Sequence, residues 1–296
     1  MALSEYVVAV DFGGTKATVA AADRAGALLA NVRLPMHASR GADQAVDRAL
    51  ATAAEVIAGL PTPPRAVGVA SPGIVLDDRI LLAPNVPGWT ELHLGKRFSS
   101  ALGVPTVCAT DVKAATLAEA RWGNLRGVHS GFHLNLGTGI AVGILVDDRV
   151  LTGAHGAAGE IGYNLVSAAS AAGPHDGRAP LEQIAGGGAI GLRGREFGGT
   201  GDAGSVFELA TRDSAARTFV DETLDELAVH VANTAILLDP ERITVGGGLV
   251  GSAGVILPAL DRVLRRAVPF PPELMLARFA QDGPLVGAAA LAWEAT

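Results

Sequence analysis

A strand that ends in a carboxylate and is followed by two glycines constrains this chain most: Asp11-Phe-Gly-Gly-Thr-Lys16. The apolar run at 6–11 predicts a buried strand, and 16–22 predicts a second strand after the turn. Glycines let a backbone approach phosphate oxygens without a clashing Cβ, and the Thr and Lys add a hydroxyl and a cation. The hexapeptide lacks the Walker spacing. It predicts a phosphate-binding hairpin, or else an ordinary hairpin with an Asp-initiated turn.

The second half of the chain opens in the same way. The apolar run 132–136 is followed by the tight turn Gly137-Thr138-Gly139 and by a second apolar run, 140–146. This internal echo suggests two related halves. As the second member of a pair, the Gly137–Gly139 turn predicts a phosphate clamp from the opposite side, although a turn of this kind alone is more often structural.

Apolar periodicity and strand-forming runs predict the other elements. Helices are expected over 41–58, 92–102, 112–122, 220–238, 255–266 and 287–293, and strands over 27–33, 66–70, 106–110 and 242–245. Alternating strands and helices indicate an α/β protein with helices packed on mixed sheets. A length of 296 residues allows one large domain or two smaller ones.

The charge and cysteine content exclude several classes of protein. The net charge is −7 without a basic block, which argues against a nucleic-acid surface. Cys108 is the only cysteine, so the chain forms no internal disulfide and no cysteine-based zinc site. The N-terminus lacks a basic region followed by an apolar stretch, and no apolar run reaches membrane-spanning length. We expect a soluble cytoplasmic protein.

Three further positions are candidates for chemistry. Asp111 follows a strand and precedes a helix, where it is either a general base or an ordinary N-cap residue. Glu160 lies among glycine and apolar residues and needs a polar partner, which a sugar diol or a structural arginine would supply. Gly246-Gly247-Gly248 is either a strand-to-helix loop or a place for a flat base near free backbone N–H groups.

Seven motifs follow one another along the chain: Asp11-Phe-Gly-Gly-Thr-Lys16, Ser71-Pro-Gly73, Asn85-Val-Pro-Gly-Trp89, Asp111, Gly137-Thr-Gly139, Ala158-Gly-Glu-Ile-Gly162 and Asp239-Pro-Glu-Arg-Ile-Thr-Val-Gly-Gly-Gly248. Each is modest alone, but the ordered set resembles the ROK family, which groups bacterial sugar kinases with sugar-responsive repressors. The resemblance covers nearly the whole chain. It implies a two-domain actin-like (ribonuclease-H-like) α/β fold with a cleft between the domains. We expect the small domain at 1–111 with 286–296 and the large one at 112–285.

The resemblance also implies roles for individual residues. Asp111 would be the catalytic base for the 6-hydroxyl of a sugar. The expected substrate-binding residues are Gly73, Thr110, Asp111, Glu160, Tyr163 and Glu182. Mg·ATP would lie along the two glycine turns, with Asp11 holding Mg²⁺ through water and the third glycine cluster facing adenosine. The expected ATP-binding residues are Asp11, Gly13, Gly14, Thr15, Lys16, Gly137, Thr138, Gly139, Gly246, Gly247 and Gly248. Many relatives are homodimers.

The chain departs from the family pattern at three places. Thr110 stands where an Asn usually precedes the catalytic Asp, and Tyr163 stands where a His is usual. The stretch 167–180 contains no cysteine where the family has a zinc motif, so we expect no structural zinc. His175 alone cannot replace that motif, because a closed zinc site needs four ligands.

We therefore expect an ATP-dependent hexose kinase acting on glucose or a glucose-like sugar. The altered pocket residues leave an amino-sugar kinase open, of the kanosamine or glucosamine type, since a site built for particular hydroxyls rejects analogues strongly. The missing zinc motif keeps a polyphosphate-using glucokinase open, although such an enzyme should have a more cationic groove than this chain offers. A non-catalytic sugar sensor and an inactive scaffold are further alternatives, and the presence of Asp11, Asp111 and Glu160 together argues against the scaffold. The ten residues before Asp11 are too few for a DNA-binding domain, which argues against a repressor.

Overall fold

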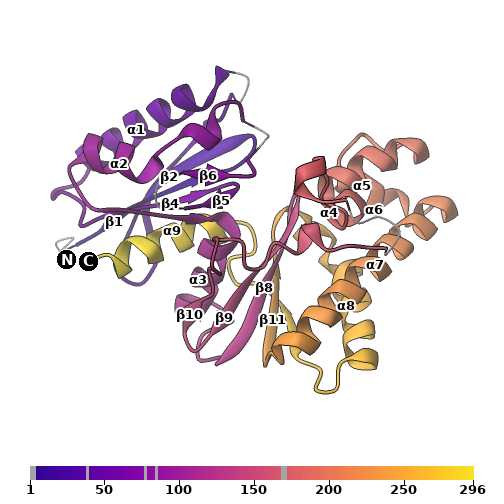
Figure 1. The fold of residues 1–296 in the computed structure, drawn as a ribbon. Helices are drawn as coiled ribbons and strands as arrows, with labels where there is room; N and C mark the ends of the chain where they lie inside the picture. Colours follow the sequence, from indigo (N-terminus) through magenta and orange to yellow (C-terminus); the bar gives the residue numbers. More distant parts are fainter. Residues whose placement is uncertain (1–4, 38–39, 77–78, 84–85, 168–171) are drawn as a thin grey trace. The chain divides into compact units, whose positions relative to one another are not determined.

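The computed structural model describes residues 5–37, 40–76, 79–83, 86–167 and 172–296. The chain divides into two compact units (Figure 1). Unit 1 comprises Met1–Arg126, Thr152–Ala158 and Asp282–Thr296, and unit 2 comprises Gly127–Leu151 and Gly159–Gln281. The chain therefore enters unit 2 twice. The predicted domain boundaries differ from these units mainly at the helix after Asp111, which belongs to unit 1, and they remain a prediction.

The sheet of unit 1 has five strands in the order β3-β2-β1-β4-β7. These strands are β1 (Val7–Phe12), β2 (Lys16–Ala22), β3 (Leu28–Pro35), β4 (Val67–Ser71) and β7 (Thr106–Thr110). β1 is antiparallel to β2 and parallel to β4, and β4 is parallel to β7. A small hairpin, β5 (Ile74–Val75) and β6 (Ile80–Leu81), follows β4. The carboxyl ends of β1, β4 and β7 therefore lie at one edge of the sheet.

Helices cover both faces of this sheet because β1 is apolar on both sides. Val8 and Val10 pack in one core cluster with residues of α1 (Ala42–Ala58) and α2 (Leu94–Leu102), the latter preceded by the 3-10 turn η2 (Trp89–Glu91). Val7 and Ala9 pack in another cluster with residues of α3 (Asp111–Trp122) and α9 (Gly283–Glu294). The approach of α9 is close: a Cβ at Gly68 of β4 would lie 1.8 Å from the Ala288 carbonyl oxygen.

Unit 2 repeats this sheet order, with strands β10-β9-β8-β11-β12. β8 is antiparallel to β9 and parallel to β11, and β11 is parallel to β12. The strands are β8 (Ser130–Leu136), β9 (Ile140–Val146), β10 (Arg149–Val150), β11 (Arg242–Gly246) and β12 (Glu273–Leu276). The predicted relation between the halves is therefore confirmed at the level of topology, because each glycine turn joins the first two strands of its sheet.

Helices of unit 2 pack against its sheet and share one hydrophobic core with it, to which α7 contributes Leu224, Leu227 and Val231. They are α4 (Glu182–Ala185), α5 (Gly187–Gly194), α6 (Ala203–Leu209), α7 (Ser214–Leu238) and α8 (Ala253–Ala267), with 3-10 turns η3 (Ile161–Tyr163), η4 (Pro174–Asp176), η5 (Arg195–Phe197) and η6 (Gly248–Ser252). In the described part of the chain, none of the helices is long and apolar enough to cross a membrane.

The predicted strands and helices are confirmed, with the largest differences at the starts of α7 and α9, which begin at Ser214 and Gly283 where the sequence predicts 220 and 287. The helices and strands that the sequence did not predict are α4, α5, α6, the β5–β6 hairpin, β10 and β12. Glycine weakens helix propensity, so the glycine-rich stretch at 186–194 carries little helical signal, and the helix there depends on packing against its neighbours.

Candidate active site

The first glycine turn joins β1 to β2 in unit 1. The Gly13 N–H donates to the Lys16 carbonyl oxygen at 2.9 Å, which closes the turn. Gly14, Thr15 and Lys16 are exposed, and a Cβ at Gly14 would meet nothing within 4 Å. Asp11 lies inside β1, paired with Thr18, so it does not begin the turn, and phosphate binding by this hairpin stays a prediction. The turn therefore offers free backbone and the Lys16 side chain beside a carboxylate.

Asp111 lies at the same edge of the sheet as Asp11, since β1 and β7 are both parallel to β4. Thr110 is the N-cap residue of α3, and Asp111 is its first helical residue, so an ordinary N-cap role for Asp111 is wrong. The Asp111 Oδ1 accepts a hydrogen bond from the Val112 N–H at 2.7 Å. Such an edge is where open α/β sheets bind ligands.

Burial raises the pKa of both carboxyl groups, and the charge of Asp111 adds to the rise at Asp11. Burial raises the pKa of Asp11 to about 7, helped by the negative charge of Asp111 and, less, of Asp282, while Lys16 opposes the rise. Burial also raises the pKa of Asp111, against the Val112 N–H and the charge of Lys113. Two close carboxyl groups in a poorly solvated place favour a cation near them.

The turn after β4 also has a constrained shape. Gly73 has φ = +82°, and a Cβ there would lie 2.6 Å from the Leu81 carbonyl oxygen. The buried Trp89 indole Nε1–H donates to the Ser71 Oγ at 2.9 Å, which joins two of the seven motifs. Asn85, from the second of these motifs, lies outside the described residues.

The second glycine turn joins β8 to β9 in unit 2, and other glycines support it. The Gly137 N–H donates to the Gly139 carbonyl at 3.0 Å. The N–H groups of Gly187 and Gly188 donate to the carbonyls of Gly137 and Thr138, at 2.9 and 3.0 Å. The run Gly186–Gly188 is not among the predicted site residues, although three consecutive glycines at the start of a helix are a signal that the sequence contains. Because a Cβ at Gly187 would lie 2.5 Å from the Gly137 oxygen, only glycine permits this contact.

The carboxylate of Glu182 lies against the same turn. Its Oε2 accepts a hydrogen bond from the Ile140 N–H at 3.1 Å, and a Cβ at Gly139 would lie 2.2 Å from that oxygen. Tyr163 lies near Glu182 and near Glu160, which is the N-cap of η3. Burial, followed by the charges of Glu160 and Glu182, raises the pKa of Tyr163. The structure thus brings together three of the predicted sugar-binding residues.

Hydrogen bonds fix the segment that carries Glu160 and Tyr163. The Val142 N–H donates to the Gly159 carbonyl at 2.8 Å. The Asn164 Nδ2 lies 3.3 Å from His230 Nδ1, and the His230 Nε2 lies 3.3 Å from Glu226 Oε1. A neutral His230 that donates from Nε2 to Glu226 accepts from Asn164 at Nδ1, so one tautomer satisfies both contacts. A pocket of about 330 Å³ borders this segment, lined in part by Glu160 and Asn164.

The third glycine cluster follows β11 and leads into η6. Gly247 has φ = +96°, and a Cβ there would lie 2.5 Å from the Leu136 carbonyl oxygen, at the end of β8. Its N–H donates to the Ala280 carbonyl at 2.7 Å, while Gly248 has open space around it. The cluster is therefore a loop between a strand and a 3-10 helix that also lies beside the second glycine turn.

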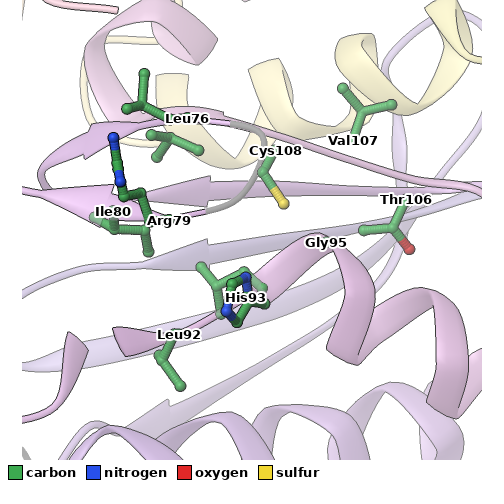
Figure 2. Close-up of a pocket in the computed structure, with 11 residues that line it drawn as sticks. Leu76, Arg79, Ile80, Leu92, His93, Gly95, Thr106, Val107 and Cys108 are labelled. Carbon is green, nitrogen blue, oxygen red and sulfur yellow. The ribbon is translucent and has the colours of Figure 1, made fainter. Parts of the chain in front are cut away.

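A separate pocket of about 300 Å³ lies in unit 1 (Figure 2). Leu76, Ile80, His93 and Cys108 are among its lining residues, and the Cys108 sulfur points into it. Burial raises the pKa of this thiol to about 12, so the thiol stays protonated and unreactive. None of the predicted site residues is among the described residues that line this pocket.

The described residues include no group of three or more His, Cys, Asp or Glu side chains that could hold a metal ion. Residues 168–171, within the stretch where the family has its zinc motif, lie outside the described part of the chain. The expectation of no structural zinc therefore remains a prediction.

Comparison with known proteins adds to this geometry. A family profile described as the ROK family matches residues 7–295. The bifunctional enzyme NanE/NanK of Brucella melitensis is 32% identical over 295 residues, covering 98% of this chain and 54% of that protein. This chain thus spans about half the length of that relative. An N-acetylmannosamine kinase of Salmonella heidelberg is 29% identical, with 96% of this chain and 97% of that protein covered.

A solved structure supports the same assignment. The ROK family glucokinase of Streptomyces griseus, crystallised with glucose and AMPPNP, superposes with a TM-score of 0.83 at 26% identity. The match covers 98% of this chain and 99% of that one. The two sheets of identical order agree with the actin-like α/β fold of these proteins. The chain has that fold, and it belongs to the ROK family.

Proposed function

We propose that this protein is an ATP-dependent hexose kinase that phosphorylates the 6-hydroxyl of glucose or a glucose-like sugar. One observation carries the proposal most: Asp11 and Asp111 lie at one edge of the unit 1 sheet, where the charge of Asp111 helps to raise the pKa of Asp11, next to an exposed glycine turn. Phosphoryl transfer mainly asks a protein to align the reactants and to neutralise charge. A base beside a phosphate-binding turn meets both demands.

The nucleotide phosphates are assigned to the two glycine turns. In unit 1, Asp11, Gly13, Gly14, Thr15 and Lys16 form this turn, and Lys16 supplies a cation. In unit 2, Gly137, Thr138 and Gly139 form the second turn, and Gly246, Gly247 and Gly248 lie beside it, where we assign the adenosine. The contact between Gly247 and the end of β8 supports this neighbourhood.

Mg²⁺ is expected with the nucleotide. The donor set fits this ion, because Mg²⁺ usually keeps several waters and binds one or two carboxylates together with phosphate oxygens. Asp11 would hold it through water, since its buried carboxyl lies beside a second acidic group and an exposed phosphate-binding turn. When bound, Mg²⁺ neutralises charge on the phosphate oxygens.

The sugar is assigned to Glu160, Tyr163 and Glu182, with Gly73 and Thr110 as further contacts. Asp111 accepts the proton of the 6-hydroxyl while that oxygen forms a bond to the γ-phosphorus and the bond to the ADP oxygen breaks. The products are a sugar 6-phosphate, ADP and one proton held first on Asp111. The half-buried carboxyl of Asp111 is held in place by the Val112 N–H, which suits a base that must point in one direction.

The identity of the sugar is a finer part of the proposal. Glucose is favoured by the glucokinase relative, which was crystallised with glucose. An amino sugar of the kanosamine or glucosamine type is the second candidate, supported by Thr110 and Tyr163 and by the N-acetylmannosamine kinase relative. We further propose that the protein is a homodimer in the cytoplasm, where ATP is available. Size-exclusion chromatography with light scattering tests the dimer.

A panel assay tests the function. The protein is incubated with Mg·ATP or with polyphosphate and with glucose, glucosamine, kanosamine, mannose and N-acetylmannosamine, and phosphate transfer is followed for each pair. We expect transfer from ATP to one of these hexoses. Transfer from polyphosphate alone would support a polyphosphate-using kinase. Sugar binding without any transfer would support the sensor.

A further inference from the structure

Asn135, near the end of β8, is a half-buried polar residue whose amide makes no hydrogen bond within the described part of the chain. Phe132, Leu134 and Leu136 of the same strand belong to the hydrophobic core of unit 2. Successive side chains of a strand point to opposite faces of its sheet, so Asn135 lies on the face opposite to that core. A half-buried amide without a protein partner is unusual, and it is available to a ligand.

The side chain of Asn135 lies between the second glycine turn and the third glycine cluster. Its Nδ2 is 3.6 Å from the position that a Cβ would take at Gly137, and its Oδ1 is 2.7 Å from the position that a Cβ would take at Gly247. Its register partners in the sheet are Ala141 on β9 and Gly246 on β11. None of these four neighbours has a side chain longer than a methyl group, so none of them covers the amide.

Asn135 also occupies the position in unit 2 that Asp11 occupies in unit 1. Each is the last residue but one of the central strand, β1 or β8, and lies two residues before the first glycine of the following turn. Each strand is parallel to the next strand of its sheet, β4 or β11. The chemistry differs, because an ionised carboxylate only accepts hydrogen bonds, whereas the amide nitrogen of asparagine is a donor. A donor at this place suits an anion.

We propose that Asn135 is a nucleotide-binding residue whose Nδ2 donates a hydrogen bond to a phosphate oxygen of ATP at the second glycine turn. This inference rests on the proposed kinase function, which assigns the phosphates to that turn. It gives the two turns different tasks: the first has a carboxylate, Asp11, which suits a cation, and the second has a neutral donor. A hydrogen bond to a charged phosphate is stronger than one between neutral groups.

Substitution of Asn135 by alanine separates this role from a structural one. The amide bonds to no described protein group, so Asn135→Ala should melt at the wild-type temperature in the absence of nucleotide. The dissociation constant of the ATP analogue AMPPNP with Mg²⁺, measured by isothermal titration calorimetry, should rise about 10- to 100-fold, as expected for the loss of a hydrogen bond to a charged group. The KM for ATP should rise with it, while the KM for the sugar stays at the wild-type value.

Asn135→Asp tests whether the ligand is the phosphate or its cation. The carboxylate has nearly the shape of the amide, but it carries a negative charge and cannot donate, so this variant should bind Mg·AMPPNP more weakly than Asn135→Ala does. Asn31→Asp, at an exposed position of β3, is the control for the added charge and should bind like the wild-type protein.

Three results would overturn the proposal. Wild-type affinity for AMPPNP in Asn135→Ala would mean that the amide does not contact the nucleotide. Tighter binding by Asn135→Asp than by Asn135→Ala would mean that the position serves the cation. A large fall in the Tm of Asn135→Ala without nucleotide would mean that the amide supports the fold. A wild-type protein that binds AMPPNP but phosphorylates no sugar would instead refute the kinase function, and the affinities of the variants would still decide the role of Asn135.

Discussion

Asp11→Asn should stabilise the free protein at neutral and alkaline pH. The folded-state pKa of Asp11 is raised from 3.8 to about 7, first by burial and then by Asp111. A carboxyl group with a raised folded-state pKa contributes stability that is complete below pH 4 and is lost as the pH rises to 7. Asparagine has the same shape but never ionises, so the variant avoids this loss.

The size of the effect follows from the pKa. A rise from 3.8 to about 7 is about 3 pH units, and each unit corresponds to about 1.4 kcal/mol, which gives an upper limit of about 4 kcal/mol. The side chain of Asp11 keeps some contact with solvent, so water and the charge of Lys16 reduce the cost of its ionisation. We expect about 1–2 kcal/mol at pH 8. For a protein of this size that is a rise in Tm of about 2–8 °C.

Thermal unfolding of both proteins between pH 4 and pH 8.5, without nucleotide, measures the effect. The difference in Tm should be near zero at pH 4, grow through pH 5–7 and level off above pH 8. Asp221→Asn, at an exposed position of α7, is the matched control and should show no such trend. Mg·ATP should then raise the Tm of the wild-type protein more than that of Asp11→Asn, because the ionised carboxylate attracts a nearby cation and the amide does not.

Two results would refute this reasoning. If Asp11→Asn is less stable than the wild-type protein at pH 8, the carboxylate makes favourable contacts in the free protein. If the difference in Tm does not depend on pH, the pKa of Asp11 is the same in the folded and unfolded states, and neither burial nor Asp111 raises it.

Three other predictions concern separate parts of the molecule. Glu182→Gln should raise the KM for sugar about 10-fold and leave the KM for ATP within about twofold in steady-state kinetics. The amide oxygen can still accept from the Ile140 N–H, but the negative charge is lost. Equal changes in both KM values would argue against a sugar contact. Gly287→Ala should cost about 2–3 kcal/mol in denaturant unfolding, since its Cβ would lie 1.8 Å from the Ala114 carbonyl oxygen, whereas Gly254→Ala, with open space, should be neutral. Treatment with a chelator should release no zinc, as measured by elemental analysis, and should leave the Tm unchanged; a stoichiometric zinc ion would contradict the prediction of no structural metal.

The sequence predicts the strands and the long helices well because their apolar residues follow a regular period. Val7 to Val10 form a short apolar run bounded by a glycine turn, and α7 carries apolar residues at helical spacing over its length. The helix α5 begins at Gly187 and contains four glycines, so its local signal is weak. Its position depends on contacts with the Gly137 and Thr138 carbonyls, which lie far away in the sequence.

The positions of candidate-site residues could be predicted where one short sequence motif determines the local structure. The turn at Gly13 and Gly14 and the strand end at Asp111 follow from local patterns alone. The support of the second turn by Gly186–Gly188, the chain Asn164–His230–Glu226 and the burial of Lys113 do not, because each depends on which distant elements pack together. A lysine in an alanine-rich helix gives no sign in the sequence that it is buried.

The central claim is that Asp111 removes the proton of a sugar hydroxyl during transfer from ATP. The most direct measurement follows the reaction of Mg·ATP with the accepted hexose by ³¹P NMR, for the wild-type protein and for Asp111→Asn. We predict a sugar 6-phosphate signal from the wild-type protein, and a rate lower by about two to four orders of magnitude in a variant that still folds and binds the sugar. Near-normal turnover of Asp111→Asn, or phosphate on no sugar oxygen at all, would contradict the claim.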